Sequence, residues 1–383
     1  MPFVTQRRLD EAPDAISRRT VVGGLAAALV APVSVVPALA RAQAPPPERL
    51  GDAALADAID GWLADAGQDF SGAVLVARRD RVILTAVRGL ADREHGRPNR
   101  LTTRFRVGSM DKMFTGLAIM QLVQAGRLDL HAPLATWLPD YPNAAVARTV
   151  TPHHLLTHTG GAGDIFGPEF DARRDSLRIL ADYVALFGAR PAEFPPGTRW
   201  EYSNYGYILL GRIIEAVSGR DYYDHVRDHV FVPAGMTGAG FEPESTVVPD
   251  RPTAYAKTDA GAVVPAEGLP WRGTPAGGGY ATVEDFHRFV TALYDGRLLD
   301  AGHRRTMTEG RVEGVSGMLF GYGFAVYPGA VPPMIGHNGI TDGMNGDLRI
   351  LGDGQATIAV LANVAPPFLA GKLGKFISAR VTI

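Results

Sequence analysis

Strand-like sequence occurs near both ends of this chain, and a long helical stretch separates the two β-rich regions. The first region contains Gly72–Arg78 and Arg81–Leu90, two β-rich runs that a short turn joins, so they predict a hairpin. The second region contains the runs Tyr322–Tyr327, Gly346–Leu351 and Ala356–Ala362. Because the terminal segments carry the strands and the middle does not, this order predicts an α+β domain with a mostly helical insertion.

Helices are predicted where apolar side chains recur at helical spacing. The predicted helices are 51–66, Met113–Ala125, Asn204–Val217, one that begins at Thr282, and Phe368–Ser378. Thr282 and Asp285 form a capping-box pattern, which marks a helix start. We therefore expect an α/β part at about 50–110 and 300–383 and a helical part at about 111–299.

Composition excludes several classes of protein. The chain has 383 residues, of which 46% are hydrophobic, so it can bury a substantial core. Its formal net charge of −2 gives no electrostatic reason to expect nucleic acid or an anionic membrane as a partner. The absence of cysteine excludes thiol nucleophiles, disulfides and cysteine-ligated metal sites. None of these features indicates an oligomeric state.

The N-terminal segment has the pattern of an export signal. Arg18-Arg19 directly precedes an apolar stretch rich in alanine and glycine, as in a bacterial twin-arginine signal. Ala38-Leu39-Ala40 and Ala40-Arg41-Ala42 both offer the small-x-small pattern of a cleavage site. A short membrane anchor or an unstructured tail is the alternative, but two prolines interrupt the apolar run, which disfavours a permanent span. We expect 1–42 to be a removed signal region and 43–383 a periplasmic or secreted protein that meets the membrane only through that transient segment.

Lysine is rare in this chain, and one lysine follows a serine at a spacing that suits catalysis. Only four of the 38 basic residues are lysine, and Lys112 alone has a serine, Ser109, three residues before it. That spacing puts both side chains on one face of the helix that follows, with the Ser109 amide near the positive end of the helix dipole. Burial can turn a lysine into a neutral base, which arginine cannot become. The pair therefore fits a serine nucleophile whose proton a lysine helps remove, although a helix cap and a solvated lysine remain the alternative.

A second motif, Tyr202-Ser203-Asn204, lies where a loop leads into the predicted apolar helix Asn204–Val217. At such a turn a phenol and an amide can point into one cavity. The phenol of Tyr202 can transfer protons to a leaving group, and the amide of Asn204 can hold a carbonyl or amide of the substrate.

A third motif, Gly336-His337-Asn338-Gly339, opens the C-terminal strand region. A glycine beside an edge strand allows a substrate backbone to approach closely, and the next amide, that of Ile340, is a candidate oxyanion donor. On its own, His337 would fit a structural loop histidine better than a functional residue.

In this order, the three motifs resemble those of the penicillin-recognising serine enzymes, in particular the class C β-lactamase-like group, which also includes esterases, D-amino-acid peptidases and acyltransferases. The matching flanking stretches are Phe70-Ser71-Gly72, Thr151–Gly161, Pro195-Pro196-Gly197 and Gly277-Gly278-Gly279. The resemblance implies a β-lactamase/transpeptidase-like fold, in which an antiparallel sheet flanked by helices meets a helical domain at a cleft.

The resemblance also implies residue roles. Ser109 is the expected nucleophile, and Lys112 and Tyr202 are expected to move protons, with the general base left open between them. The expected substrate-binding and oxyanion residues are Asn204, His337, Asn338, Gly339 and Ile340. No cofactor is expected, and no metal, because His154 and His158 lack the intervening glutamate of a zinc-protease helix.

One departure from the family pattern bears on the substrate. Members that act on penicillins or peptidoglycan often carry threonine or serine where this chain has Asn338, and a lysine where it has His337. Recognition of a substrate carboxylate is therefore less expected. We predict a serine hydrolase that forms an acyl-enzyme with a small ester or amide. The alternatives are a β-lactamase or D-amino-acid peptidase with the same residues, and a catalytically silent binding protein of the same fold.

Overall fold

The computed structural model describes residues 47–266 and 270–383. The expected signal region, 1–42, lies outside the described residues, so export stays a prediction. Residues Glu48–Ile383 form one compact unit. None of the helices in the described ranges is both long and apolar enough to span a membrane.

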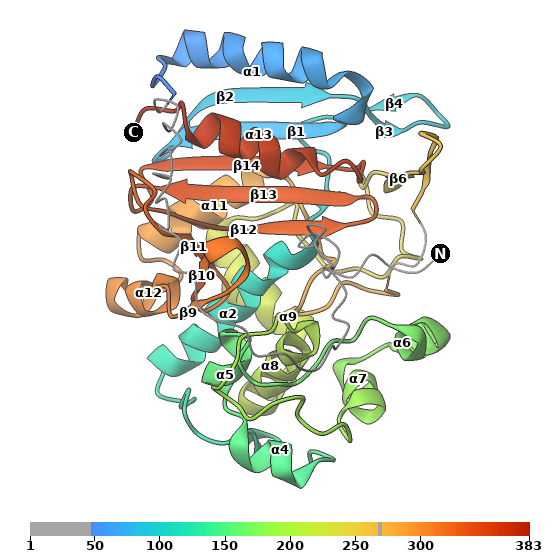
Figure 1. Cartoon of the computed structure of the whole chain (residues 1–383), viewed down its shortest axis with the longest axis vertical. Helices are drawn as coiled ribbons and strands as arrows, with labels where there is room; N and C mark the ends of the chain where they lie inside the picture. Colours follow the sequence, from blue (N-terminus) through green and yellow to red (C-terminus); the bar gives the residue numbers. More distant parts are fainter. Residues whose placement is uncertain (1–46, 267–269) are drawn as a thin grey trace, which may run out of the picture. The chain divides into compact units, whose positions relative to one another are not determined.

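One antiparallel sheet joins the two ends of the chain (Figure 1). Its strand order is β2-β1-β14-β13-β12-β11-β10-β9. The bounds are β1 Gly72–Arg78, β2 Arg81–Arg88, β9 Val312–Glu313, β10 Leu319–Phe320, β11 Ala325–Tyr327, β12 Met334–Thr341, β13 Met344–Leu351 and β14 Ala356–Ala362. β1 pairs with β14 in the register Gly72↔Ala362 to Arg78↔Ala356. The predicted α+β class, with a sheet built from both terminal segments, is confirmed.

Each face of the sheet carries its own core, because successive side chains of a strand point to opposite faces. In β1, Val74 and Val76 pack with α1 (Asp52–Ala66) and α13 (Leu369–Ser378) on one face. Leu75, on the other face, belongs to the larger core that also contains the helical part. The sheet is thus covered by helices on both sides (Figure 1).

The predicted strand over Tyr322–Tyr327 is wrong in its first half. Only Ala325–Tyr327 forms β11, while Tyr322 is buried and its amide donates to the Met307 carbonyl. Gly323 interrupts the strand with a φ of 85°, and a Cβ there would lie 2.5 Å from the Lys112 carbonyl oxygen. The chain therefore turns at Gly323 to let a helix pass, which apolar content alone does not reveal.

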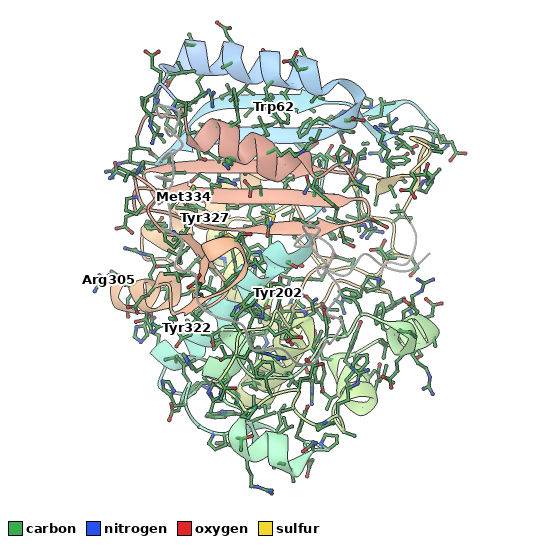
Figure 2. All side chains as sticks on the ribbon, in the orientation of Figure 1. Trp62, Tyr202, Arg305, Tyr322, Tyr327 and Met334 are labelled. Atoms are coloured by element: carbon green, nitrogen blue, oxygen red, sulfur yellow. The ribbon has the colours of Figure 1, made fainter. Side chains whose placement is uncertain are left out.

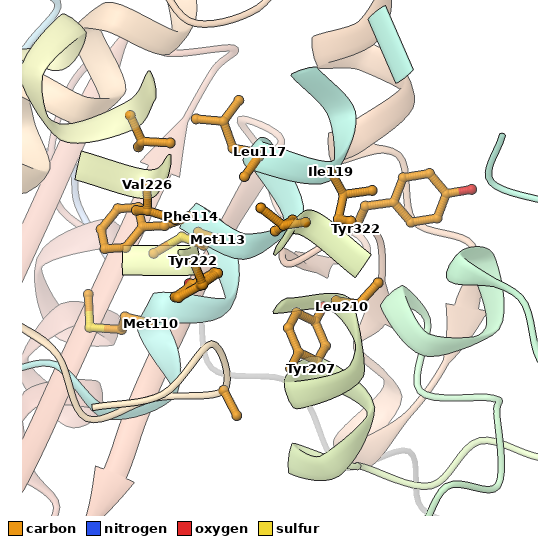
Figure 3. Packing of buried hydrophobic residues seen from close by; sticks show 14 of the residues in the cluster. Met110, Met113, Phe114, Leu117, Ile119, Tyr207, Leu210, Tyr222, Val226 and Tyr322 are labelled. Atoms are coloured by element: carbon orange, nitrogen blue, oxygen red, sulfur yellow. The ribbon is translucent and has the colours of Figure 1, made fainter. Parts of the chain in front are cut away.

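Helix α2 (Asp111–Gln124) runs through the larger core and is buried on nearly every side. Its sequence is apolar all round, as expected for a helix enclosed by others. Figure 3 shows Met113, Phe114 and Leu117 of α2 among side chains of α8 (Asn204–Ser218) and α9 (Tyr222–Val226). The start of α2 is therefore held from several directions at once.

The remaining α-helices and one π-helical turn lie between the two halves of the sheet in sequence. They are α3 Leu134–Trp137, α4 Ala144–Thr149, α5 Pro152–Leu156, α6 Pro168–Arg173, α7 Leu180–Phe187, a π-helical turn Arg227–Phe231, α10 Val232–Ala234, α11 Val283–Tyr294 and α12 Ala301–Thr308. The short strand pairs are β3 Leu90–Asp92 with β4 Arg97–Pro98, β5 Phe105–Arg106 with β8 Tyr280–Ala281, and β6 Tyr255–Lys257 with β7 Val263–Pro265. The capping box predicted at Thr282 is present, since the Thr282 hydroxyl accepts from the Asp285 amide at 3.0 Å.

Candidate active site

Ser109 lies in a single 3₁₀ turn, Gly108–Met110, that leads directly into α2. Gly108 has a φ of 54°, a left-handed conformation that glycine adopts without strain. A Cβ at Gly108 would lie 3.2 Å from the Gly339 Cα and 3.4 Å from the Ile340 nitrogen. The tight turn thus brings the backbone beside Ser109 close to β12, and the Ser109 side chain stays partly exposed.

Lys112 is fully buried, one helical turn from Ser109. Its Nζ lies 3.4 Å from the Ser109 Oγ, 2.8 Å from the Asn204 Oδ1 and 2.6 Å from the Ala276 carbonyl oxygen. Burial lowers the pKa of Lys112 to about 7, although the nearby carboxyl groups of Asp164 and Asp111 act to raise it. A substantial fraction of Lys112 is therefore a neutral amine near pH 7.

The contacts of the Lys112 nitrogen can be made by a neutral amine. A neutral amine has two N–H donors and one lone pair, whereas the ammonium form has three donors and none. The Asn204 Oδ1 and the Ala276 carbonyl are acceptors only, so they take the two N–H groups. In the neutral amine the lone pair is then left for the proton of the Ser109 hydroxyl 3.4 Å away, whereas in the ammonium form the third N–H donates to that oxygen.

Tyr202 borders the same serine. Its phenol hydrogen-bonds the Ser109 hydroxyl, and its ring centroid is 4.7 Å from the Lys112 Nζ. Figure 2 shows Tyr202 between the sheet and the helical part. Burial raises the pKa of Tyr202 well above its usual value, so the phenol keeps its proton at neutral pH. The geometry thus brings Ser109, Lys112 and Tyr202 together, as the sequence predicted for their placement.

Asn204 begins α8 and holds Lys112 through its side-chain oxygen. Its Nδ2 donates to both oxygens of Asp164, at 3.0 and 3.2 Å. Because Asp164 takes the amide NH₂ group, the carbonyl end of Asn204 must face Lys112. Sequence reasoning missed Asp164, which follows a glycine-rich turn and lies forty residues before its partner. Burial raises its pKa.

Asp111, also missed, anchors a glycine loop behind the nucleophile. Its carboxyl group is buried and accepts from the Gly279 amide at 2.6 Å, and burial raises its pKa to about 8. A Cβ at Gly279 would lie 2.9 Å from that carboxyl group. In the same loop, the Gly278 amide donates to the Gly108 carbonyl at 3.3 Å. Asp111, the residue directly before Lys112 in the motif, therefore fixes the loop that packs against the Ser109 turn.

The third motif lies within β12, and His337 faces Lys112. His337 is 4% exposed, and burial together with the Lys112 charge lowers its pKa to about 4. Its Nδ1 lies 2.6 Å from the Asn338 carbonyl oxygen, so Nδ1 carries the proton of a neutral ring. The position therefore holds no fixed positive charge.

Asn338 and Ile340 turn their side chains to the opposite face of the sheet. Asn338 is in register with Asp347, and Ile340 with Asn345. Asn345 accepts from the first turn of α13, on the face away from α2. The side chains of Asn338 and Ile340 are both exposed. A contribution of Ile340 at Ser109 would therefore come from its backbone amide.

Two details of the third motif differ from expectation. β12 is not an edge strand of the sheet, but β11 pairs only with Met334–Gly336, so no strand of the described chain pairs with the rest of β12 on that side. The close approach at Gly339 is made by the protein itself, since a Cβ there would lie 2.0 Å from the Val107 carbonyl oxygen. Because Gly339 has no side chain, the Ser109 turn can pack directly against β12.

Comparisons with known proteins identify the family of the chain. The beta-lactamase family profile matches residues 58–379. The chain is 31% identical over 310 residues to the putative penicillin-binding protein PbpX of Bacillus subtilis, which covers 80% of this chain and 73% of that protein. It is 38% identical over 195 residues to esterase EstB of Burkholderia gladioli, which covers 46% of this chain and 50% of that protein.

A solved structure agrees as well. The penicillin binding protein of Bacillus halodurans has a TM-score of 0.75 and 30% identity, with 86% of this chain and 99% of that chain covered. The predicted resemblance is confirmed by these matches. The chain belongs to the beta-lactamase family and is a serine hydrolase of that family.

Proposed function

We propose that this enzyme hydrolyses small uncharged esters or amides, with Ser109 as nucleophile and the neutral amine of Lys112 as general base. The observation that carries the proposal is the fully buried Lys112 nitrogen, which lies 3.4 Å from the Ser109 Oγ and contacts two other acceptors. With those acceptors taking its two N–H groups, the neutral amine keeps its lone pair for the Ser109 proton. A lysine with a pKa of about 7 suits a base that must first take and later return a proton. Tyr202 is better suited to relay a proton than to act as the base, because its phenol stays protonated.

The reaction proceeds in two steps, acylation of Ser109 and hydrolysis of the acyl-enzyme. The Ser109 Oγ attacks the acyl carbon while its proton passes to the Lys112 Nζ, and the backbone amides of Ser109 and Ile340 stabilise the oxyanion. Collapse of the tetrahedral intermediate breaks the bond to the leaving alcohol or amine, which takes a proton from Lys112 through Tyr202. Water then attacks the acyl-enzyme, gives its proton to Lys112, and releases the acid as the Ser109 hydroxyl is restored.

The charge of the site favours uncharged substrates. His337, where penicillin-recognising relatives often have a lysine, is neutral because burial and the Lys112 charge depress its pKa. Asp164 adds a carboxyl group within reach of Asn204. A penicillin or a peptidoglycan stem ends in a carboxylate, and the His337 position offers that carboxylate no fixed cation. The esterase relative supports an ester substrate.

A substrate panel tests the proposal. Short p-nitrophenyl esters, the corresponding anilides and a chromogenic cephalosporin should be assayed with wild type, Ser109→Ala and, as a matched control, the exposed Ser245→Ala. We expect kcat/KM for one of the uncharged substrates to exceed that for the cephalosporin, and to fall at least about a thousandfold in Ser109→Ala alone. Ester hydrolysis that survives Ser109→Ala would refute the mechanism. A higher kcat/KM for the cephalosporin than for every uncharged substrate would mean that the enzyme acts on β-lactams instead.

We further propose that the enzyme is exported. The support is the Arg18-Arg19 pair before an apolar segment. Fractionation of cells that express the full chain, beside an Arg18→Lys/Arg19→Lys variant, should give periplasmic or secreted protein only for the wild type. Equal distribution of both forms would contradict this.

A further inference from the structure

His158 has no part in the steps described above, yet it contacts the catalytic tyrosine from several directions. It follows α5 in the turn that begins at Thr157, and it is 2% exposed. Its φ is 59°, a left-handed conformation that is uncommon for non-glycine residues, although histidine adopts it more often than most. Such a backbone persists only where surrounding contacts hold it.

The contacts of His158 lie on both sides of Tyr202. The Glu201 amide donates to the His158 carbonyl oxygen at 2.9 Å, and the Ser203 amide donates to the His158 Nδ1 at 3.1 Å. The backbone amides of the residues before and after Tyr202 are thus both tied to His158. The imidazole and phenol rings are also stacked, with centroids 4.3 Å apart and an interplanar angle of 25°. Backbone and ring of Tyr202 are therefore fixed together.

The hydrogen bond from Ser203 also defines the state of the imidazole. An Nδ1 that accepts an amide proton carries none itself, so the ring is neutral and its proton lies on Nε2. Burial lowers the pKa of His158 well below its usual value, which keeps the ring in that form. His158 thus acts as an acceptor and a stacking surface, and it does not carry protons.

We propose that His158 is the positioning residue that holds the Tyr202 phenol against the Ser109 hydroxyl. The inference rests on the proposed function, because it assigns a role to the support of Tyr202. Its basis is the pair of hydrogen bonds on either side of Tyr202 and the stacked rings. The phenol must reach the serine oxygen for proton relay, and a displacement of about 1 Å at such a group can cost about a hundredfold in rate.

Two substitutions separate the two kinds of contact. His158→Asn keeps an acceptor for the Ser203 amide and tolerates the left-handed backbone, but it removes the stacked ring. His158→Phe keeps a stacking ring and leaves the Ser203 amide without its acceptor. His154→Asn is the matched control, since His154 lies in α5, four residues before His158, and its Nδ1 accepts from the Thr151 amide instead. Active sites are counted by fluorophosphonate titration, so that kcat refers to folded enzyme only.

We expect kcat per titrated site on a p-nitrophenyl ester to fall about ten- to a hundredfold in at least one His158 variant, with KM within about threefold of wild type. His154→Asn should keep the wild-type kcat. If His158 acts through Tyr202, adding His158→Asn to Tyr202→Phe should lower kcat by less than about twofold further. Each of these three results is measured on the same substrate and the same titrated enzyme.

Two outcomes would overturn the inference. Wild-type kcat in both His158 variants would show a role in folding alone, and full additivity with Tyr202→Phe would show that His158 acts elsewhere. Failure of the proposed function is seen separately, because it would appear as undiminished hydrolysis by Ser109→Ala.

Discussion

Replacing Lys112 with methionine should change how the stability of the protein depends on pH. Lys112 is fully buried, and its pKa falls from 10.5 to about 7 in the folded state. The unfolded chain therefore holds one more proton than the folded protein between these two values. Because the unfolded state binds the extra proton, the wild type gains stability as the pH rises from about 7 towards 10.5. Methionine has a similar length and does not titrate, so the variant loses this gain.

The lowered pKa sets the size of the effect. The difference in proton affinity destabilises the wild type by about 4 kcal/mol at pH 7 and by about 2 kcal/mol at pH 9, at ~1.4 kcal/mol per pKa unit. The stability of wild type minus that of Lys112→Met should therefore rise by about 2 kcal/mol between these pH values. The variant also deprives the Asn204 Oδ1 and the Ala276 carbonyl of a donor, but that loss is nearly the same at both pH values and cancels.

Urea unfolding at pH 7 and pH 9, followed by tryptophan fluorescence, measures both free energies. Asp111, whose pKa is raised to about 8, lowers stability as the pH rises to that value. Because the Lys112 charge acts to lower the pKa of Asp111, this loss is no smaller in the variant, so it adds to the expected difference and does not reverse it. The exposed Lys372→Met is the control and should follow the wild type. Parallel behaviour of wild type and Lys112→Met would mean that Lys112 is charged in the fold, and the argument for a neutral base would fail.

Three further predictions concern rate and packing. The kcat/KM for an uncharged ester should rise about tenfold between pH 6 and pH 8, as Lys112 loses its proton near pH 7; a profile that falls over this interval would exclude the neutral amine as base. Gly339→Ala should reduce kcat/KM about a hundredfold, because its Cβ would lie 2.0 Å from the Val107 carbonyl oxygen and displace the Ser109 turn; unchanged kinetics would show that the strand yields without moving the serine. Asp347→Ala should lower the free energy of unfolding, measured in urea, by about 3–5 kcal/mol, since it leaves the buried Arg349 without its partner at 2.7 Å. A loss below about 1 kcal/mol would show that solvent reaches Arg349.

Local sequence predicted much of the fold because the decisive signals are local. The hairpin over β1 and β2 follows from a short turn between two β-rich runs, and α11 begins directly after Thr282 because its capping box closes there. The terminal strand β14 was predicted with its observed bounds, Ala356–Ala362. The error at Tyr322 arose from a contact distant in sequence, the approach of α2 to Gly323, which no local pattern records.

The same division separates the site residues that were predicted from those that were missed. Ser109 and Lys112 share one helical turn, so their spacing alone indicates their proximity. Asp164 and His158 act through partners forty or more residues away, and their contacts arise only when the turn after α5 meets the start of α8. The Asn338 side chain points to the sheet face away from α2. That direction depends on the register of β12 with β13, which the motif does not contain.

The central claim is that Ser109 becomes acylated with the help of a neutral Lys112. The most direct measurement mixes enzyme with a slowly deacylating p-nitrophenyl ester, quenches in acid, and locates the added mass by peptide mapping. We predict one acyl group on Ser109 in the wild type, none in Ser109→Ala, and at least about hundredfold slower appearance in Lys112→Met. An acyl group on another residue, or acylation of Ser109 at an equal rate without Lys112, would contradict the account.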